Sequence, residues 1–417
     1  MRPFWQRYLL GALSALIVLG GLYWLPPVHR RLAWRLDAAR TSVRMVLHPV
    51  GAPPTPIGAP TAISTATPTH LSPTLAAAVP SATPTPGPTT TPTPSPTPPP
   101  PAVSLNPPKW ESQDWNNCGP TTLALYLRWW GWEGDQYDIS HIVKPKRGDR
   151  NVNVEELIAF INNGVRGMSA IYRVGGDLQT LERVLAAGMP VMIEESMHFH
   201  EKYWPNDDQW GAHYLLITGY DDVKREFITQ DSFRGPNRRV AYEELRRNWE
   251  AFNFVYILVF PNGRLGLVKR LLGENWNTDT NRTRALEKAR AAAQAHPNDA
   301  FAWFNVGTNL LYFERYGEAA SAYDRALKIG LPQRFLRYQF GPFIAYFHTA
   351  RFQDLLALTD YALKVTPNSE EAHLWRGWAL YRLGKKREAI AEFRAALEAN
   401  PRYEDALYAL RFLGVMP

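Results

Sequence analysis

The spacing of apolar and polar residues divides this chain of 417 residues into four segments. Residues 8–25 form one continuous apolar run, whereas residues 49–108 show no apolar periodicity. Residues 109–262 mix strand-like and helix-like patterns, and residues 263–417 are helical in pattern. A chain of this length with these changes of pattern is predicted to hold more than one domain.

Residues 1–48 are predicted to anchor the chain in a membrane. The run Tyr8–Leu25 holds eighteen residues without a charge, which just spans a hydrocarbon core of roughly 30 Å at about 1.5 Å per residue. A cleaved signal peptide is the alternative, but no small-x-small cleavage site follows the run. Between Arg30 and Val46, apolar residues and arginines recur at helical spacing, which predicts a basic amphipathic helix beside the membrane.

Residues 49–108 are predicted to be a disordered Pro/Thr-rich linker. They contain 20 prolines and no Asp, Glu, Lys or Arg, so they cannot bury a core and stay extended. Tracts of this kind resemble stalks that hold a domain away from a bacterial envelope. We therefore expect a single-pass membrane protein whose folded part is extracytoplasmic, although the arginines after the span favour the cytoplasmic side by the positive-inside rule.

Residues 109–262 are predicted to form one α+β domain, because short strand patterns alternate there with amphipathic helix patterns. The expected helices are 118–130, 154–163, 178–187 and 242–249, and the expected strands are 169–174, 191–194, 213–219, 226–231 and 254–260.

Composition excludes several classes of protein. The chain is 45% apolar and 20% charged, so it is not disordered as a whole, and its net charge of +7 is spread without a dense basic run. We therefore expect no nucleic-acid partner. With a single cysteine, it has no intrachain disulfide and no cysteine-based zinc site. His198 and His200 are expected to be solvated in a polar loop, so no metal or cofactor is predicted.

The single cysteine, Cys118, is a candidate nucleophile. Asn116 and Asn117 are predicted to cap a helix that begins at Cys118, which places the sulfur where the helix dipole favours a thiolate. Five residues earlier, Gln113 offers an amide that, with the Cys118 N–H, would form an oxyanion hole. The alternative is that Cys118 is a buried apolar filler.

A base and an orienting group for this cysteine are predicted in a hairpin. His213 begins one predicted strand and Asp231 ends the next. If the reversal between them centres on Asp222, antiparallel pairing sets His213 opposite Asp231, at a distance that permits a hydrogen bond. A register slip of one residue would separate them, and the alternative reading is a hairpin whose His and Asp merely lie at its open end.

Three stretches carry a family resemblance: Gln113-x-x-x-x-Cys118-Gly-Pro, Gly211-Ala-His213-Tyr followed by Gly219-Tyr-Asp-Asp, and Gln230-Asp231-Ser. Together they resemble the papain-fold bacteriocin-leader-processing peptidases, family thirty-nine of the cysteine peptidases, and their stand-alone "like" branch. The resemblance implies a papain-like fold with Cys118 as nucleophile, His213 as general base, Asp231 as its orienting group and Gln113 as oxyanion donor. In this chain Gln113 stands five residues before Cys118, whereas in the transporter-fused members the glutamine typically stands six residues before the cysteine.

Residues 263–417 are predicted to be an all-α array of tetratricopeptide repeats with a C-terminal capping helix. Ala292, Ala326, Ala362 and Ala396 recur at intervals of 34, 36 and 34 residues, as expected for stacked helix pairs. The middle unit, 333–367, departs from the pattern because Gly341-Pro342 interrupts an expected helix. Such repeats resemble protein-interaction modules, and the alternative is a structural extension of the preceding domain.

These observations predict a membrane-anchored cysteine peptidase that acts on a peptide or protein substrate and recruits a protein partner through its repeats. Two alternatives stay open. The first is a tethered scaffold whose papain-like domain is catalytically silent. The second is acyl transfer or amidase activity, which would use the same three residues.

Overall fold

The computed structural model describes residues 13–14, 18, 20–21, 26–56, 99–146 and 151–415. Most of the predicted membrane span and residues 57–98 of the predicted linker lie outside these ranges. Within the described part of the chain, no helix is long and apolar enough to cross a membrane.

An antiparallel sheet of seven strands organises the α+β domain, in the order β2-β7-β3-β4-β5-β6, with β1 paired to the end of β4. Nearly continuous runs of buried residues give the central strands β3, β4 and β7 two buried faces. The strands are β1 (Ala102–Ser104), β2 (Met168–Arg173), β3 (Val191–His198), β4 (Trp210–Asp221), β5 (Glu226–Asp231), β6 (Gly235–Ala241) and β7 (Tyr256–Pro261).

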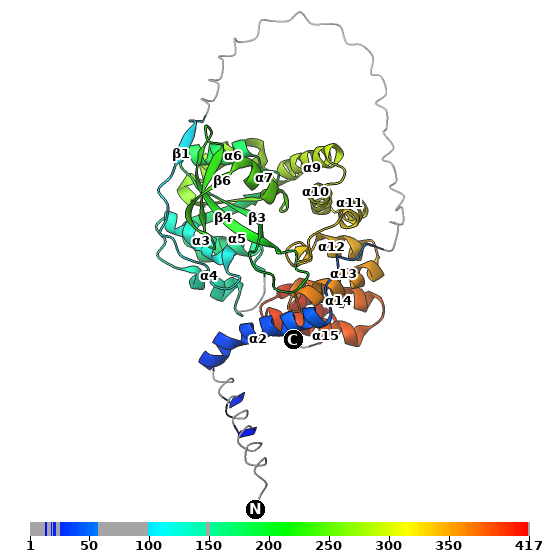
Figure 1. The fold of residues 1–417 in the computed structure, drawn as a ribbon. Coiled ribbons are helices and arrows are strands. Elements are labelled where there is room, and N and C mark those ends of the chain that lie inside the picture. The colour runs from blue at the N-terminus through cyan, green and yellow to red at the C-terminus, as the bar shows by residue number, and fades with distance from the viewer. Residues whose placement is uncertain are drawn as a thin grey trace, which may run out of the picture.

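Helices cover both faces of this sheet (Figure 1). Met192 and Leu216 face the core beneath α3 and α5, whereas the next residues along each strand, Ile193 and Ile217, face the core beneath α6, α7 and α8. The helices of the domain are α3 (Cys118–Trp129), α4 (Gln136–Val143), α5 (Val154–Gly164), α6 (Leu178–Ala186) and α7 (Tyr242–Glu250), with α8 (Leu265–Leu272) after the last strand.

The sequence located the long elements and missed four short ones: β1, α4, β6 and α8. β1 contradicts the predicted boundary at residue 109, because it lies inside the range assigned to the linker and pairs with residues 219–221 of β4. Ala102–Ser104 carries only one apolar side chain of strand-forming type, so its pattern is too short to be recognised.

The C-terminal region is all-helical, and its helices stack in consecutive antiparallel pairs (Figure 1). In the middle unit, Gly341 and Pro342 begin a helix instead of interrupting one, because proline fits the first turn. The helices are α9 (Thr278–Ala295), α10 (Ala300–Tyr312), α11 (Tyr316–Ile329), α12 (Gly341–His348), α13 (Phe352–Val365), α14 (Glu370–Arg382), α15 (Lys386–Ala399) and α16 (Glu404–Phe412).

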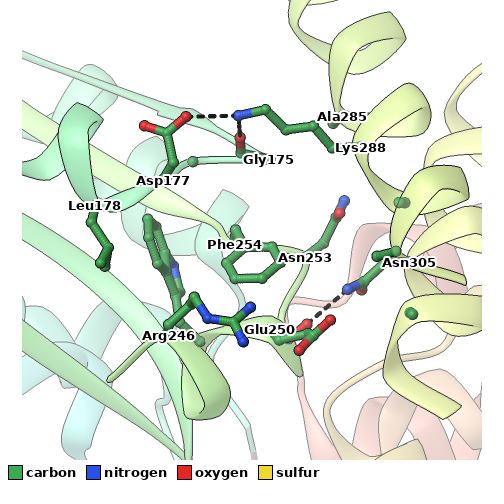
Figure 2. Close-up of a pocket in the computed structure, with 15 residues that line it drawn as sticks. Gly175, Asp177, Leu178, Arg246, Glu250, Asn253, Phe254, Ala285, Lys288 and Asn305 are labelled. Atoms are coloured by element: carbon green, nitrogen blue, oxygen red, sulfur yellow. Dashed lines mark hydrogen bonds and ion pairs between the residues drawn. The ribbon is translucent and has the colours of Figure 1, made fainter. Parts of the chain in front are cut away.

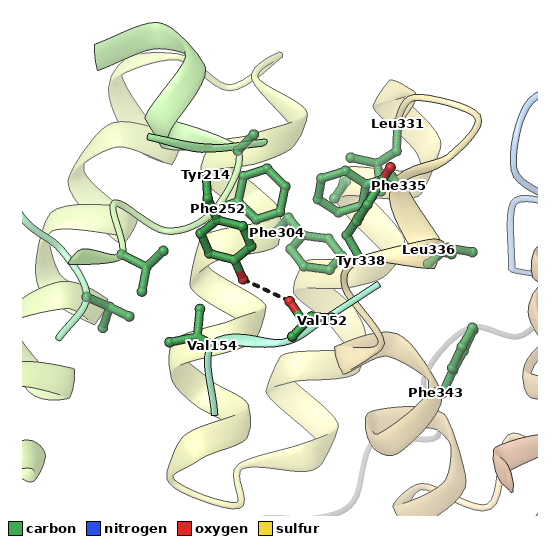
Figure 3. Packing of buried hydrophobic residues seen from close by; sticks show 14 of the residues in the cluster. Val152, Val154, Tyr214, Phe252, Phe304, Leu331, Phe335, Leu336, Tyr338 and Phe343 are labelled. Atoms are coloured by element: carbon green, nitrogen blue, oxygen red, sulfur yellow. Dashed lines mark hydrogen bonds between the residues drawn. The ribbon is translucent and has the colours of Figure 1, made fainter. Parts of the chain in front are cut away.

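One hydrophobic core continues from the α+β domain into the repeats. Figure 3 shows Tyr214 and Phe252 of the α+β domain close to Phe304, Phe335 and other apolar side chains of the repeats. These residues belong to a single buried cluster. The two regions therefore share apolar packing and do not merely follow each other along the chain.

Polar contacts also join the two regions around a cavity of about 290 Å³ between α7 and the helices α9 and α10 (Figure 2). Asn305 donates a hydrogen bond of 2.8 Å to the carbonyl oxygen of Glu250. Lys288 donates to the carbonyl oxygen of Gly175 at 2.9 Å and pairs with Asp177 at 2.8 Å. These bonds fix α9 and α10 against the domain on the side remote from β1.

A buried ion pair fastens the irregular segment between α11 and α12 to the loop between β3 and β4. Both guanidinium nitrogens of Arg334 donate to the two carboxylate oxygens of Asp207, at 2.7 and 2.8 Å. The Arg334 guanidinium also lies 4.1 Å from the ring centroid of Trp204. Gln333, the preceding residue, accepts a bond from the Trp204 indole at 3.0 Å and donates its backbone N–H to Asp208 at 2.7 Å.

The segment that follows helix α2 (Pro26–Leu47) is docked on the repeats. Met45 and Val50 are fully buried. Lys364 donates to the carbonyl oxygen of Pro49 at 3.0 Å, and Tyr361 donates to that of Gly51 at 3.1 Å.

This docking changes the expectation of a stalk at residues 49–108. Residues 49–53 lie against α13, and at the other end Pro101 accepts the backbone N–H of Asp222 at 2.9 Å. The Pro/Thr-rich segment thus begins and ends on the same folded body. The distance from α2 to that body is therefore set by the docked residues and not by the length of the linker.

Replacing Val50 with Asp is expected to release this docked segment, because the buried apolar contact, worth about 2 kcal/mol, is replaced by a buried charge. Hydrogen–deuterium exchange of residues 44–53 in the full chain should then accelerate. Val46→Asp is the matched control, since Val46 is 58% exposed and Val50 is fully buried. Equal protection in the two variants would contradict the docking.

Candidate functional site

Cys118 is the first residue of α3 and is half-buried. The first-turn amides of a helix have no partner within it, so the sulfur lies beside a row of backbone N–H groups. Gly119 leaves little room for a larger residue, because a Cβ there would lie 3.3 Å from the ring of Tyr214 and 3.4 Å from Leu157. Asn117 is the N-cap residue, as predicted, but its side chain makes no capping hydrogen bond to the described helix and its amide donates to Gln136 instead.

His213 and Asp231 meet in the buried core of the site. The Nε2 atom of His213 lies 2.9 Å from Oδ1 of Asp231, and the other side of the ring is hydrogen-bonded to Cys118. The same Oδ1 accepts the backbone N–H groups of Phe233 and Arg234 at 2.8 and 2.9 Å. The structure therefore brings three of the four predicted residues into one hydrogen-bonded row.

The predicted pairing register of the hairpin is wrong. The β4–β5 ladder starts with Asp221 opposite Glu226, so the reversal centres between residues 223 and 224 instead of on Asp222. If this register continued unbroken, His213 would lie opposite residue 234 and on the other face of the ladder from Asp231.

A β-bulge at Thr218 returns His213 and Asp231 to the same face of the β4–β5 ladder. The register shifts between Ile217 and Gly219, and beyond the shift the ladder ends with Leu216 opposite Gln230. In that register Asp231 lies diagonally across from His213 on the same face. The predicted contact is therefore present, but it is diagonal and depends on one extra residue in β4.

The charges of the row support one another. Burial raises the pKa of the Cys118 thiol, but the hydrogen bond and charge of His213 and the N–H groups of Tyr214 and Gly119 bring it below its ordinary value. Burial lowers the pKa of His213, yet Asp231 and Cys118 raise it to about 10. Burial also works against ionised Asp231, but His213 holds the pKa of that carboxyl at about 2. The favoured state is a thiolate, an imidazolium and a carboxylate.

Gln113 lines the same cleft as Cys118 and His213. Its side-chain oxygen accepts a hydrogen bond of 2.9 Å from Ser232, and its backbone N–H donates to the carbonyl oxygen of Ser232 at 2.9 Å. These bonds orient the amide so that its NH₂ group is the end available to the cleft. The enclosed space is about 40 Å³, close to the volume of one water molecule, so a peptide must lie along its open side.

The loop that carries Gln113 and Cys118 is held by Gln136, which the sequence analysis missed. The side-chain oxygen of Gln136 accepts three hydrogen bonds: from the Asp114 N–H at 2.7 Å, the Asn117 amide at 2.8 Å and the Thr121 hydroxyl at 3.0 Å. Its NH₂ group donates to the carbonyl oxygen of Ser112 at 2.9 Å. Gln136 begins α4, a helix whose polar pattern gave no sequence signal for this role.

Lys144 supports the same loop from the other end of α4. Its buried ammonium donates to the carbonyl oxygens of Trp115 and Asn116 at 3.0 and 2.8 Å. Asn116 has a φ of 48°, a left-handed conformation that asparagine tolerates better than most residues. The loop thus reaches Cys118 in one fixed geometry.

A second carboxyl group lies across the sheet from the imidazole. Glu195 on β3 pairs directly with His213 on β4, and its buried Oε2 atom has no hydrogen-bond partner among the residues that the structure describes. Burial raises the pKa of Glu195 to about 8, with His213 opposing the shift and Asp231 adding to it. Burial thus favours the neutral form of Glu195, and Asp231 is the carboxylate that contacts the His213 ring. Two consecutive glutamates in an apolar strand were the available sequence signal.

His198 and His200 are not part of the row of Cys118, His213 and Asp231. His198 ends β3 and His200 lies in the loop after it, and both are exposed.

Comparisons with known protein families divide the chain as the fold does. Residues 105–257 match the Peptidase_C39 like family. Residues 280–333 and 370–410 match tetratricopeptide repeat families. No curated protein is similar enough to the chain to count as a match.

Solved structures resemble each part. A structure described as a C39-like peptidase from Bacillus anthracis is 16% identical, with a TM-score of 0.32 over 39% of this chain and 98% of its own. The peptidase domain of Streptococcus ComA is 14% identical, with a TM-score of 0.28 over 37% of this chain and 97% of its own. The Arabidopsis OM64 TPR domain is 23% identical, with a TM-score of 0.25 over 27% of this chain and 93% of its own. Residues 105–257 of this chain form a Peptidase_C39-like domain, and tetratricopeptide repeats follow it.

Proposed function

We propose that this protein is a membrane-anchored cysteine peptidase that hydrolyses peptide bonds through an acyl-enzyme. The observation that supports it most directly is the hydrogen-bonded row of Cys118, His213 and Asp231 at the start of a helix. A thiolate beside an imidazolium is the state in which a cysteine attacks a carbonyl carbon.

In this proposal each residue has one role. The Cys118 thiolate attacks the carbonyl carbon, and the Gln113 amide with the Cys118 N–H stabilises the negative oxygen that forms. His213 gives its proton to the leaving amine, and a thioester remains on Cys118. His213 then takes a proton from water, which attacks the thioester and releases the acid. Asp231 keeps the imidazole ring oriented throughout.

The repeats are proposed to bind a protein partner or the substrate itself. Support comes from the tetratricopeptide match and from the exposed aromatic side chains of the last helix, Tyr408 and Phe412, which are 58% and 55% exposed. Aromatic side chains of this kind are enriched at protein interfaces.

The N-terminal part is proposed to hold the protein at a membrane, with the peptidase domain on the extracytoplasmic side. In α2, Leu36, Val43 and Leu47 are exposed and lie along one side of the helix, and Arg35 and Arg40 are exposed among them. An exposed face of this composition suits an anionic lipid surface. Protease protection of the folded part in intact cells measures the side directly: degradation without lysis is expected, and full protection would contradict it.

Cys118→Ala and His213→Ala are each expected to abolish hydrolysis while the domain stays folded. The reason is that the first removes the nucleophile and the second removes the proton carrier, whose contribution alone is about 10²–10⁴-fold. Cleavage of a pooled peptide library by the full chain, read by mass spectrometry, checks this, with circular dichroism as the control for folding. Hydrolysis retained by Cys118→Ala would reject the proposal.

The thiol is expected to react at a pH well below that of a free cysteine. Because Cys118 is the only cysteine, the rate of alkylation by iodoacetamide against pH reports this group alone. His213, with a pKa of about 10, stays protonated across neutral pH, so reactivity falls only as the pH drops through the lowered thiol pKa.

The matched controls are the unfolded chain, with a midpoint near pH 8.5, and His213→Ala, in which only the backbone N–H groups of Tyr214 and Gly119 oppose burial and the midpoint rises. A native midpoint at or above that of the unfolded chain would favour the silent scaffold.

A further inference from the structure

The wall of the cleft beside Cys118 is built partly by the repeats. Arg337 and Tyr338 line the same cleft as Cys118 and His213. They belong to the irregular segment between α11 and α12, at the end of the short helix η3 (Phe335–Arg337). The unit of the array that departs most from the repeat pattern is thus the one that reaches the reacting atoms.

This segment is held in place on both sides of Arg337. Arg334, three residues earlier, forms the buried ion pair with Asp207. Tyr338, the next residue, packs against Trp210 and Phe252, with ring centroids 5.8 and 6.4 Å apart. Figure 3 shows Tyr338 in the aromatic cluster with Phe304 and Phe335. The Arg337 backbone is therefore fixed relative to the site.

A second hollow adjoins the cleft. Its lining is His200, Phe233, Arg234 and Arg238, and its volume is about 620 Å³. Phe233 lines both spaces and is 46% exposed. A peptide in the cleft that extends by about 3.3 Å per residue passes from one space into the other within a few residues.

Apart from the groups of the row itself, the charged side chains among the described residues that line the two spaces are all arginines. Arg337, Arg234 and Arg238 line the two spaces, and no Asp or Glu is among their described lining residues. The carboxylate of Asp231 is buried and pairs with His213 and, at 3.6 Å, with Arg238. Guanidinium groups in a partly enclosed site bind carboxylates with two parallel hydrogen bonds and repel ammonium groups.

We propose that the cleft selects peptides with an Asp or Glu side chain close to the scissile bond, and that Arg337 of the repeats and Arg234 of the peptidase domain bind this carboxylate. This inference rests on the proposed peptidase activity for its consequence, but the binding itself does not need catalysis. It makes the repeats part of the substrate site, in addition to any partner that they recruit.

The test uses the full chain with Cys118→Ala, which binds without cleaving. The probes are fluorescein-labelled decapeptide sublibraries that end in a carboxamide and have one position fixed as Glu, Gln or Lys. Fluorescence anisotropy should give at least about tenfold tighter binding for the best Glu sublibrary than for its Gln counterpart, and the weakest binding for Lys. The preference should shrink between 50 and 500 mM salt, as expected for partly exposed charges.

Arg337→Gln and Arg234→Gln should each reduce the ratio of Glu to Gln affinity, and Arg337→Lys should retain part of it. Arg247→Gln is the matched control, because Arg247 is exposed on α7 and lines neither space. Thermal melting shows whether each variant is folded. If Arg337→Gln unfolds, the ratios of Glu to Gln affinity for Arg337→Lys and Arg234→Gln test the inference: an unchanged ratio in both would contradict it.

Equal binding of the Glu and Gln sublibraries would overturn the inference. Preference for a free C-terminal carboxylate, whatever the fixed side chain, would also overturn it and assign the arginines to the end of a peptide. Cleavage by the unmodified chain without a Glu preference would retain the peptidase and reject the selectivity. A Glu preference in binding without any cleavage would retain the selectivity and reject the peptidase.

Discussion

The buried ion pair between Arg334 and Asp207 determines how the two regions of this protein meet. Both side chains are almost completely removed from solvent, and each carboxylate oxygen of Asp207 accepts a hydrogen bond from an N–H group of the Arg334 guanidinium. Such a pair adds little stability over apolar residues of the same size, but losing one partner leaves a buried charge, which costs about 3–5 kcal/mol. Other arrangements of the repeats against the peptidase domain are therefore disfavoured. The placement of Tyr338 and Phe199, which both line the cleft, follows from this constraint.

The sequence located most of the elements because their patterns are strong. The helix at Cys118 and the strand at His213 are long apolar runs bounded by polar or glycine residues, and both are present near the expected positions. The contact of His213 with Asp231 is present, but the direct pairing from which it was predicted is wrong. A bulge at Thr218 leaves no mark in the alternation of β4, since every residue from 214 to 220 is buried on one face or the other. A pairing register cannot be read from a strand whose two faces are both apolar.

The supporting residues of the site were beyond sequence reasoning for a different reason. Gln136 and Lys144 act through backbone atoms of a distant loop, and backbone partners have no sequence signature. Arg337 was hidden by the departure of its unit from the repeat pattern. The residues between Leu331 and Phe340 do not form the helix expected of a regular unit, because they pack instead against the peptidase domain.

The composition of the Pro/Thr-rich segment predicts that it forms no core, but it does not predict what the residues on either side of it contact. The 42 residues between Pro56 and Pro99 suggested a spacer, yet both flanks lie on one body. Closing a chain of that length, treated as fully flexible, costs roughly 3 kcal/mol and grows only slowly with added residues. Burial of Met45 and Val50 supplies about 1.5–3 kcal/mol each, and the hydrogen bonds from Tyr361 and Lys364 add to it. The docked arrangement is therefore favourable. Lengthening that segment would leave the peptidase domain at the same distance from α2.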